Sequence, residues 1–126
     1  MKVFFIGANL SLDNMESHVL DALLDMGHDV NFFDSSSWYK KNTIVDKYIK
    51  YAAHKLLREP ELRKEKALLK EVNDFKPDLI LVLLGSNLSP KAVKKIKKTV
   101  KVPIVCWCQD QLSTLGRQYV IGADYD

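Results

Sequence analysis

Two short loop sequences contain the residues of this chain that are best suited to contact a ligand. Gly7-Ala8-Asn9 follows the apolar run Val3–Ile6, and Gly85-Ser86-Asn87 follows the apolar run Leu79–Leu84. Both belong to the repeated pattern G-[AS]-N-L-S. Glycine lets the backbone approach a ligand, while Asn and Ser supply neutral donors and acceptors that suit sugars, phosphates or nucleotides. Ordinary turn chemistry, in which Asn and Ser cap backbone groups, is an equally good interpretation.

Two acids, Asp13 and Asp110, are expected near the same rim: Asp13 comes soon after the first loop, and Asp110 follows the apolar run that ends at Trp107. A carboxylate within hydrogen-bond reach of a hydroxyl can act as its general base. Each acid also has a structural interpretation, since Asp13 can cap one helix and Asp110 can start another. The sequence therefore names two candidate catalytic acids and identifies no catalytic residue. The predicted ligand-binding residues are Gly7, Ala8, Asn9, Gly85, Ser86, Asn87, Trp107, Gln109 and Asp110.

Several chemistries are disfavoured by missing motifs. Gly7 lacks the later glycines of the dinucleotide pattern G-x-G-x-x-G, and no G-K-[ST] triplet occurs for a P-loop. Cys106 and Cys108 are two residues apart on a predicted strand, so their side chains should share a face. No further cysteine or nearby histidine completes a metal ligand set, which favours free thiols. We expect neither a metal nor a cofactor.

The elements that must position these loops alternate between strands and helices. Strands are predicted at 2–6, 28–33, 79–84 and 102–107, and helices at 43–58, 61–74, 90–98 and 111–118. A further helix is expected between an N-cap at Asp13 and a terminating glycine at Gly27. This order predicts an α/β, three-layer Rossmann-like domain with a parallel sheet, right-handed crossovers and the strand order 2-1-3-4. Residues 119–124 could begin a fifth strand.

This predicted strand order brings the two loops together. The chain order reverses between strands 1 and 3, and open α/β sheets bind ligands at such a switch point. Residues 7–9 and 85–87 should therefore lie side by side, with residues 107–110 on their flank. The repeated loop sequence and the predicted topology indicate the same crevice.

The helices carry recognisable apolar stripes. The first has Met15, Val19, Ala22, Leu23 and Met26 at helical spacing, which predicts one core-facing stripe. The helix at 61–74 has Leu62, Leu69 and Val72 as its apolar positions, and the helix at 90–98 should turn Ala92, Val93 and Ile96 inward. The lysines on that last helix and its exit are Lys91, Lys94, Lys95, Lys97, Lys98 and Lys101. No aromatic residues interleave with them, so a solvated helix face is favoured over a nucleic-acid surface.

The totals describe one domain, residues 1–126. The chain is 47% hydrophobic and 28% charged with a net charge of +3, which is typical of a globular protein. No apolar run approaches the roughly 20 residues of a membrane span. Strand-like sequence follows Met1-Lys2 directly without a signal-peptide pattern, so we expect a cytoplasmic protein.

Four segments together resemble a known family. They are K-V-F-F-I-G at 2–7, L-D-M-G-H-D-V at 24–30, K-P-D-L-I-L-V at 76–82 and V-C-W-C-Q-D at 105–110. In this order and spacing the chain resembles the amino-terminal half of GT-B glycosyltransferases, in particular the spore maturation protein CgeB-like group of the glycosyltransferase 4-like families.

The resemblance implies a function that needs a second domain. GT-B enzymes have two Rossmann-like domains, of which the amino-terminal one mainly receives the acceptor and the other holds the nucleotide-sugar donor. By this resemblance residues 7–9, 85–87 and 109–110 would line the acceptor side, and the chain alone would not transfer sugar. The donor domain is not within these 126 residues.

Other classes of function remain open at this stage. One is a stand-alone ligand-binding or regulatory module. A phosphorylation receiver needs an Asp at the end of strand 3, where this chain has Gly85, and the cobalamin motif D-x-H-x-x-G does not occur. Another is a self-assembling module in which an exposed face is covered by a second copy, giving a homodimer.

Overall fold

The computed structural model describes residues 1–8, 10–11, 14–35, 59–83, 88–108 and 123–126, with side chains at 59–62 left aside. These residues form an α/β domain around a four-stranded parallel sheet of order β2-β1-β3-β4. The strands are β1 (Lys2–Gly7), β2 (Asp29–Asp34), β3 (Leu79–Leu83) and β4 (Ile104–Trp107). The predicted three-layer architecture and strand order are confirmed.

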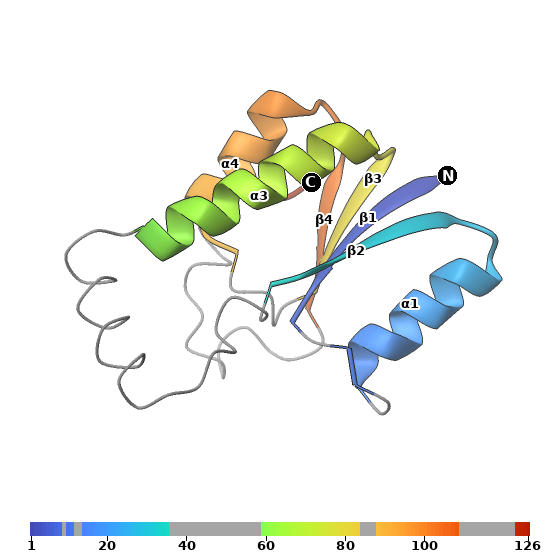
Figure 1. Cartoon of the computed structure of the whole chain (residues 1–126). Helices are drawn as coiled ribbons and strands as arrows, with labels where there is room; N and C mark the ends of the chain where they lie inside the picture. The colour runs from blue at the N-terminus through green and yellow to red at the C-terminus, as the bar shows by residue number, and fades with distance from the viewer. Residues whose placement is uncertain (9, 12–13, 36–58, 84–87, 109–122) are drawn as a thin grey trace, which may run out of the picture.

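Helices lie on both faces of this sheet. They are α1 (Met15–Asp25), α3 (Glu59–Phe75) and α4 (Pro90–Thr99). Figure 1 shows α3 and α4 side by side on one face and α1 on the other. This division follows from right-handed crossovers: the connection from β1 to β2 runs in one direction across the sheet, and the later connections run in the other.

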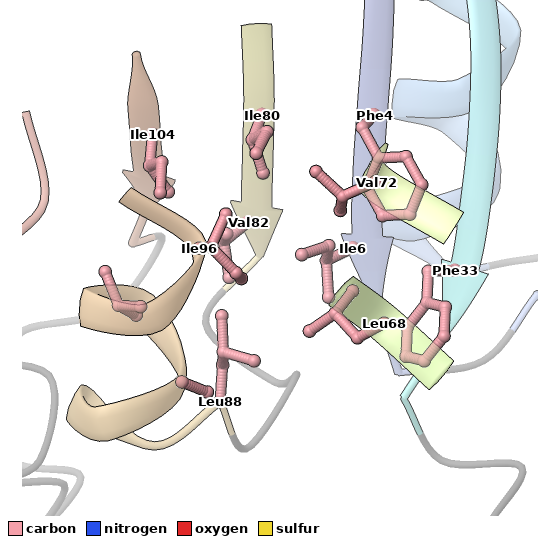
Figure 2. Packing of buried hydrophobic residues seen from close by; sticks show 12 residues of the cluster. Phe4, Ile6, Phe33, Leu68, Val72, Ile80, Val82, Leu88, Ile96 and Ile104 are labelled. Atoms are coloured by element: carbon pink, nitrogen blue, oxygen red, sulfur yellow. The ribbon is translucent and has the colours of Figure 1, made fainter. Parts of the chain in front are cut away.

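The larger core fills the space between the sheet and helices α3 and α4. Figure 2 shows Phe4 and Ile6 of β1 and Ile80 and Val82 of β3 pointing toward the side chains of these helices. Alternate residues of each strand face this layer, as the two-residue period of a strand requires. The buried helical residues of this core are Leu68, Val72, Ala92, Val93 and Ile96. The inward face predicted for residues 90–98 is therefore confirmed.

The smaller core lies under α1. Val19 packs with Phe5 and Leu83, and the Phe5 and Phe32 rings meet edge to face with centroids 5.3 Å apart. Met15 and Leu23 are partly buried against this core. Two members of the predicted stripe do not share this burial: Ala22 and Met26 are exposed. The stripe is wider than the contact because α1 covers only part of its sheet face.

The first helix has a different N-cap from the predicted one. The cap of α1 is Asn14, whose Oδ1 accepts a hydrogen bond from the Ser17 backbone N–H at 3.0 Å. Asp13 therefore lies one residue before the cap, and Asn serves this position as well as Asp does. Gly27 adopts a positive φ of 78° after the helix, as its predicted terminating role requires.

Helix α3 also starts earlier than predicted, at Glu59 rather than Glu61. Pro60 is tolerated there because the first-turn N–H groups of a helix have no intrahelical acceptor. The buried residues of its inner face are Lys64, Leu68 and Val72, each four residues apart. Of the predicted apolar positions, Val72 is fully buried and Leu69 packs partly buried against the larger core, while Leu68 is a buried residue that the prediction did not name.

Some predictions fall on residues that the structure does not describe. These are the helices at 43–58 and 111–118 and the residues 119–122 of the suggested fifth strand. The last described residues, 123–126, lie against β4, where Asp126 exchanges two hydrogen bonds with Ile104: its N–H donates to Ile104 O and its carboxylate accepts from Ile104 N, both at 2.9 Å. Within the described part, no helix has the length and hydrophobicity to cross a membrane.

Candidate functional site at the carboxyl edge of the sheet

The strand order creates a switch point between β1 and β3. Ile6 pairs with Val82, so the two strands end side by side, at Gly7 and Leu83. The chain continues from β1 to one face of the sheet and from β3 to the other, into α1 and α4 respectively. An open α/β sheet offers its ligand crevice at such a point.

Gly7 has a packing role that the sequence did not reveal. A Cβ at this position would lie 2.9 Å from Glu16 Cγ and 2.9 Å from Phe32 Cε2. Both distances are shorter than real Cβ contacts, so the first turn of α1 approaches β1 this closely only because residue 7 is glycine. The Glu16 side chain is thereby held over the end of β1.

The end of β2 adds polar groups to the same edge. Asp34 is the register partner of Gly7, and the Ser35 N–H donates to Gly7 O at 2.8 Å. Ser35 is buried, with 2% of its surface exposed. Glu16, Asp34 and Ser35 were not among the predicted site residues. The available signal was the run Asp34-Ser35-Ser36-Ser37 directly after a strand, which resembles an ordinary loop.

The start of α1 brings more hydroxyl and amide groups to this edge. The Ser17 hydroxyl donates to Ser11 O at 2.5 Å and also lies 2.9 Å from Asn14 Oδ1. The Asn14 N–H donates to Ser11 O at 3.3 Å. These bonds close the turn before α1 and fix the direction in which the chain leaves β1.

The start of α4 is fixed by a second polar cluster. Ser89 Oγ caps the helix by accepting from Ala92 N at 3.2 Å, and it lies 3.3 Å from Glu65 Oε1 of α3. Glu65 Oε2 also pairs with Lys95 Nζ at 2.6 Å. The predicted cap at Ser89 and first helical residue at Pro90 are confirmed. Lys64, which precedes Glu65 in the sequence, is buried, with 7% of its surface exposed.

The structure places three of the nine predicted ligand-binding residues. Gly7 and Ala8 lie at the end of β1, and Trp107 ends β4. Trp107 is 46% exposed and lines a groove between α1 and the sheet. The remaining six, Asn9, Gly85, Ser86, Asn87, Gln109 and Asp110, and the candidate acid Asp13, lie outside the described residues.

The cysteine pair has the geometry expected of neighbours on one strand face. Cys106 and Cys108 are free and half-buried, with their Sγ atoms 3.8 Å apart. Burial raises the pKa of the Cys106 thiol to about 12, and its hydrogen bond with Cys108 acts in the same direction. A thiol with so high a pKa is a poor nucleophile at neutral pH. Among the described residues, no three His, Cys, Asp or Glu side chains are grouped to hold a metal.

The described polar groups at this edge are carboxylates and hydroxyls. Carboxylates come from Glu16 and Asp34, and hydroxyls come from Ser11 and Ser17. Carboxylates accept hydrogen bonds from sugar hydroxyls, whereas they repel phosphates. Comparison of the chain with models of protein families, with curated proteins and with solved structures gave no match.

Proposed function

We propose that this chain is the acceptor-side domain of a GT-B-type glycosyltransferase. The observation that carries the proposal is the strand order β2-β1-β3-β4, which gives the sheet a switch point between the ends of β1 and β3. The four family-like segments support it further, because each of them overlaps one of the four strands. The acceptor would be a sugar or glycoconjugate with a free hydroxyl.

The proposed role is to hold and orient this hydroxyl. Glycosyl transfer needs the acceptor oxygen next to the sugar of the donor, and a carboxylate that takes its proton assists the step. Asp13 and Asp110 are the candidate bases, and Glu16 and Asp34 are further carboxylates at the same edge. The donor would be held by a separate domain, so this chain alone binds the acceptor without transferring sugar.

The proposal is tested by binding of simple glycosides to the isolated chain. The probes are methyl α- and β-glycosides of glucose, mannose and N-acetylglucosamine, and saturation-transfer NMR detects their binding. At least one should bind, and UDP-glucose should not be consumed in its presence. Asn9→Ala and Asn87→Ala should each weaken binding, whereas Asn73→Ala on the exposed face of α3 should leave it unchanged. Binding that is unaffected by both loop variants would contradict the proposal.

A second candidate function is that of a binding or assembly module without catalysis. The observation that favours it is the apolar groove beside α1, whose lining includes the exposed side chains of Met26 and Trp107. The two candidates differ in where a ligand contacts the chain: at the carboxyl edge of the sheet for the acceptor domain, and on the α1 face for the module.

A further inference from the structure

The face of the sheet that carries α1 is only partly covered by the described residues. α1 packs on Phe5, Val30 and Phe32 of β1 and β2. On β3, Leu83 is buried under α1, whereas Leu81 and the β4 side chains Val105 and Trp107 extend this face beyond the helix; Val105 is 38% and Trp107 46% exposed. Parallel sheets are normally covered on both faces, so this exposed apolar surface calls for an explanation.

A groove of about 550 Å³ runs along this surface, between α1 and the two strands. Its walls are almost wholly apolar. The sheet side is formed by Leu81 and Trp107, and the helix side by Met15, His18, Val19, Ala22, Leu23 and Met26.

The helix side of the groove is a second stripe of α1. Met15, His18, Ala22 and Met26 follow one another at intervals of three, four and four residues, which places them on one flank of the helix. Val19 and Leu23 lie next to this flank, where they line the groove and also pack against the smaller core. Ala22, in the middle, has no side chain beyond Cβ and so leaves room for another helix to approach closely. An apolar groove beside a helix suits an amphipathic helix as its occupant.

The negative charge of α1 favours a partner helix that carries basic side chains. Exposed Asp21 and Asp25 each follow a groove residue, His18 and Ala22, by three positions, which places them beside it on the helix surface and at the outer rim of the groove. The helix sequence M-E-S-H-V-L-D-A-L-L-D contains three acids and neither lysine nor arginine, although the whole chain has a net charge of +3. An α1 helix from a second copy would bring acids against acids, and an anionic membrane would be repelled.

We propose that this groove binds an amphipathic helix of a partner protein, with an apolar stripe at i, i+3 or i+4, and i+7 and with lysine or arginine beside the stripe. The apolar side chains would contact Leu81, Ala22 and Trp107, and the basic side chains would lie next to Asp21 and Asp25. This inference is independent of the proposed acceptor site, since it concerns a different face of the sheet.

The experiment uses the full chain with Trp38→Phe, so that Trp107 is the sole tryptophan. Two peptides of about 18 residues serve as probes. They share one leucine stripe and differ only in carrying lysine or glutamate beside it. Binding is followed by Trp107 fluorescence and by the amide shifts of α1. The lysine peptide should bind about threefold to tenfold more tightly than the glutamate peptide, since two rim charge pairs contribute modestly.

Three variants make the result specific to the groove. Ala22→Arg should fill the groove and weaken the binding of the lysine peptide by at least about tenfold. Because Ala22 is exposed, the substitution should leave the unfolding midpoint unchanged. Asp21→Asn with Asp25→Asn should remove the preference for the lysine peptide. Glu71→Gln with Asp74→Asn, an equal charge change on the exposed side of α3, should not alter it.

The proposal is overturned if neither peptide shows saturable binding to the chain, or if the two peptides bind with equal affinity. It is also overturned if acrylamide does not quench Trp107 in the free chain, because the groove would then already be covered. Concentration-dependent dimerisation that Ala22→Arg abolishes would assign the groove to a second copy instead.

Discussion

At the scale of single residues, the structure explains Gly7 by contact rather than by turn geometry. The space that a Cβ would need is already taken by Glu16 Cγ and Phe32 Cε2, both 2.9 Å away. Gly27 is the opposite case: its φ of +78° requires glycine, although nothing lies within 4 Å of the missing Cβ. The two glycines are therefore needed for separate physical reasons, one steric and one conformational.

This difference predicts the effects of two alanine substitutions. Gly7→Ala should lower the free energy of unfolding by about 1–3 kcal/mol through overpacking, and Gly27→Ala by about 1–2 kcal/mol through left-handed strain. Urea denaturation measures both. Phe32→Leu removes part of the clash and should recover some of the loss in the Gly7→Ala background only. Equal stability of Gly7→Ala and the parent chain would show that the helix can move away.

A further prediction concerns the reactivity of Cys106. Because its pKa is raised to about 12, its thiolate fraction at neutral pH is very small. Burial is the largest cause of the raised pKa and remains in a Cys108→Ser variant, so iodoacetamide should alkylate Cys106 there far more slowly at pH 8 than it alkylates an unstructured cysteine peptide. Denaturation in urea should restore the peptide rate. Rapid alkylation of the folded variant at pH 8 would contradict the assigned burial.

At the scale of elements, the polar contacts at the helix and strand ends hold the layers in register. Ser89 caps α4 and lies next to Glu65, which pairs with Lys95. At the opposite edge, the Lys2 N–H donates to Asp78 Oδ2 at 2.7 Å, joining the start of β1 to that of β3. These contacts position the strands whose carboxyl ends carry the candidate site.

Removal of the α4 cap should be measurable. Ser89→Ala loses the bond from Ala92 N and should lower the free energy of unfolding by about 1 kcal/mol. Ser89→Thr keeps a hydroxyl at the same place and should lose only a few tenths of this value, about 0.3 kcal/mol. Thermal and urea unfolding would measure the two variants together. An alanine variant no less stable than the threonine variant would argue against the capping geometry.

The last described segment gives a prediction for pH dependence. Asp126 accepts hydrogen bonds from Lys97 Nζ at 2.8 Å and from Ile104 N at 2.9 Å, and these lower the pKa of its carboxyl below its usual 3.8. A lowered folded pKa contributes stability above pH 3.8 that is lost as the pH falls through the folded value. The stability difference between the parent chain and Asp126→Asn should therefore shrink on acidification below pH 4. A difference that is constant with pH would contradict the contact.

The order of the elements was largely predictable from the sequence, whereas the extent of contact between the α1 helix and the sheet was not. Apolar runs and the glycine and proline signals located all four strands, and their alternation with helices predicted the order 2-1-3-4 through right-handed crossovers. The same pattern could not show that Ala22 and Met26 remain exposed, because spacing identifies a stripe without saying how much of it is covered. The cap shifted from Asp13 to Asn14 since both residue types suit the position. Lys64 was missed because a buried lysine has no periodic signal.

At the scale of the whole molecule, the domain has two separate surfaces that suit binding. The carboxyl edge of the sheet offers the switch point between β1 and β3, with Glu16, Asp34 and Ser35 beside it. The α1 face offers an apolar groove with an acidic rim. The topology made the first surface predictable, while the second depends on side-chain packing that only the structure reveals.

The most direct measurement is an amide chemical-shift titration of the ¹⁵N-labelled chain with the glycosides named above. We expect the shift changes to concentrate at the carboxyl edge, at Gly7, Ala8 and Ser35, and to saturate as glycoside is added. The amino edge of the same sheet, at Lys2, Asp78 and Lys101, serves as the internal control and should not respond. Saturable shifts confined to the amino edge or to the outer faces of α3 and α4 would contradict an acceptor site at the switch point.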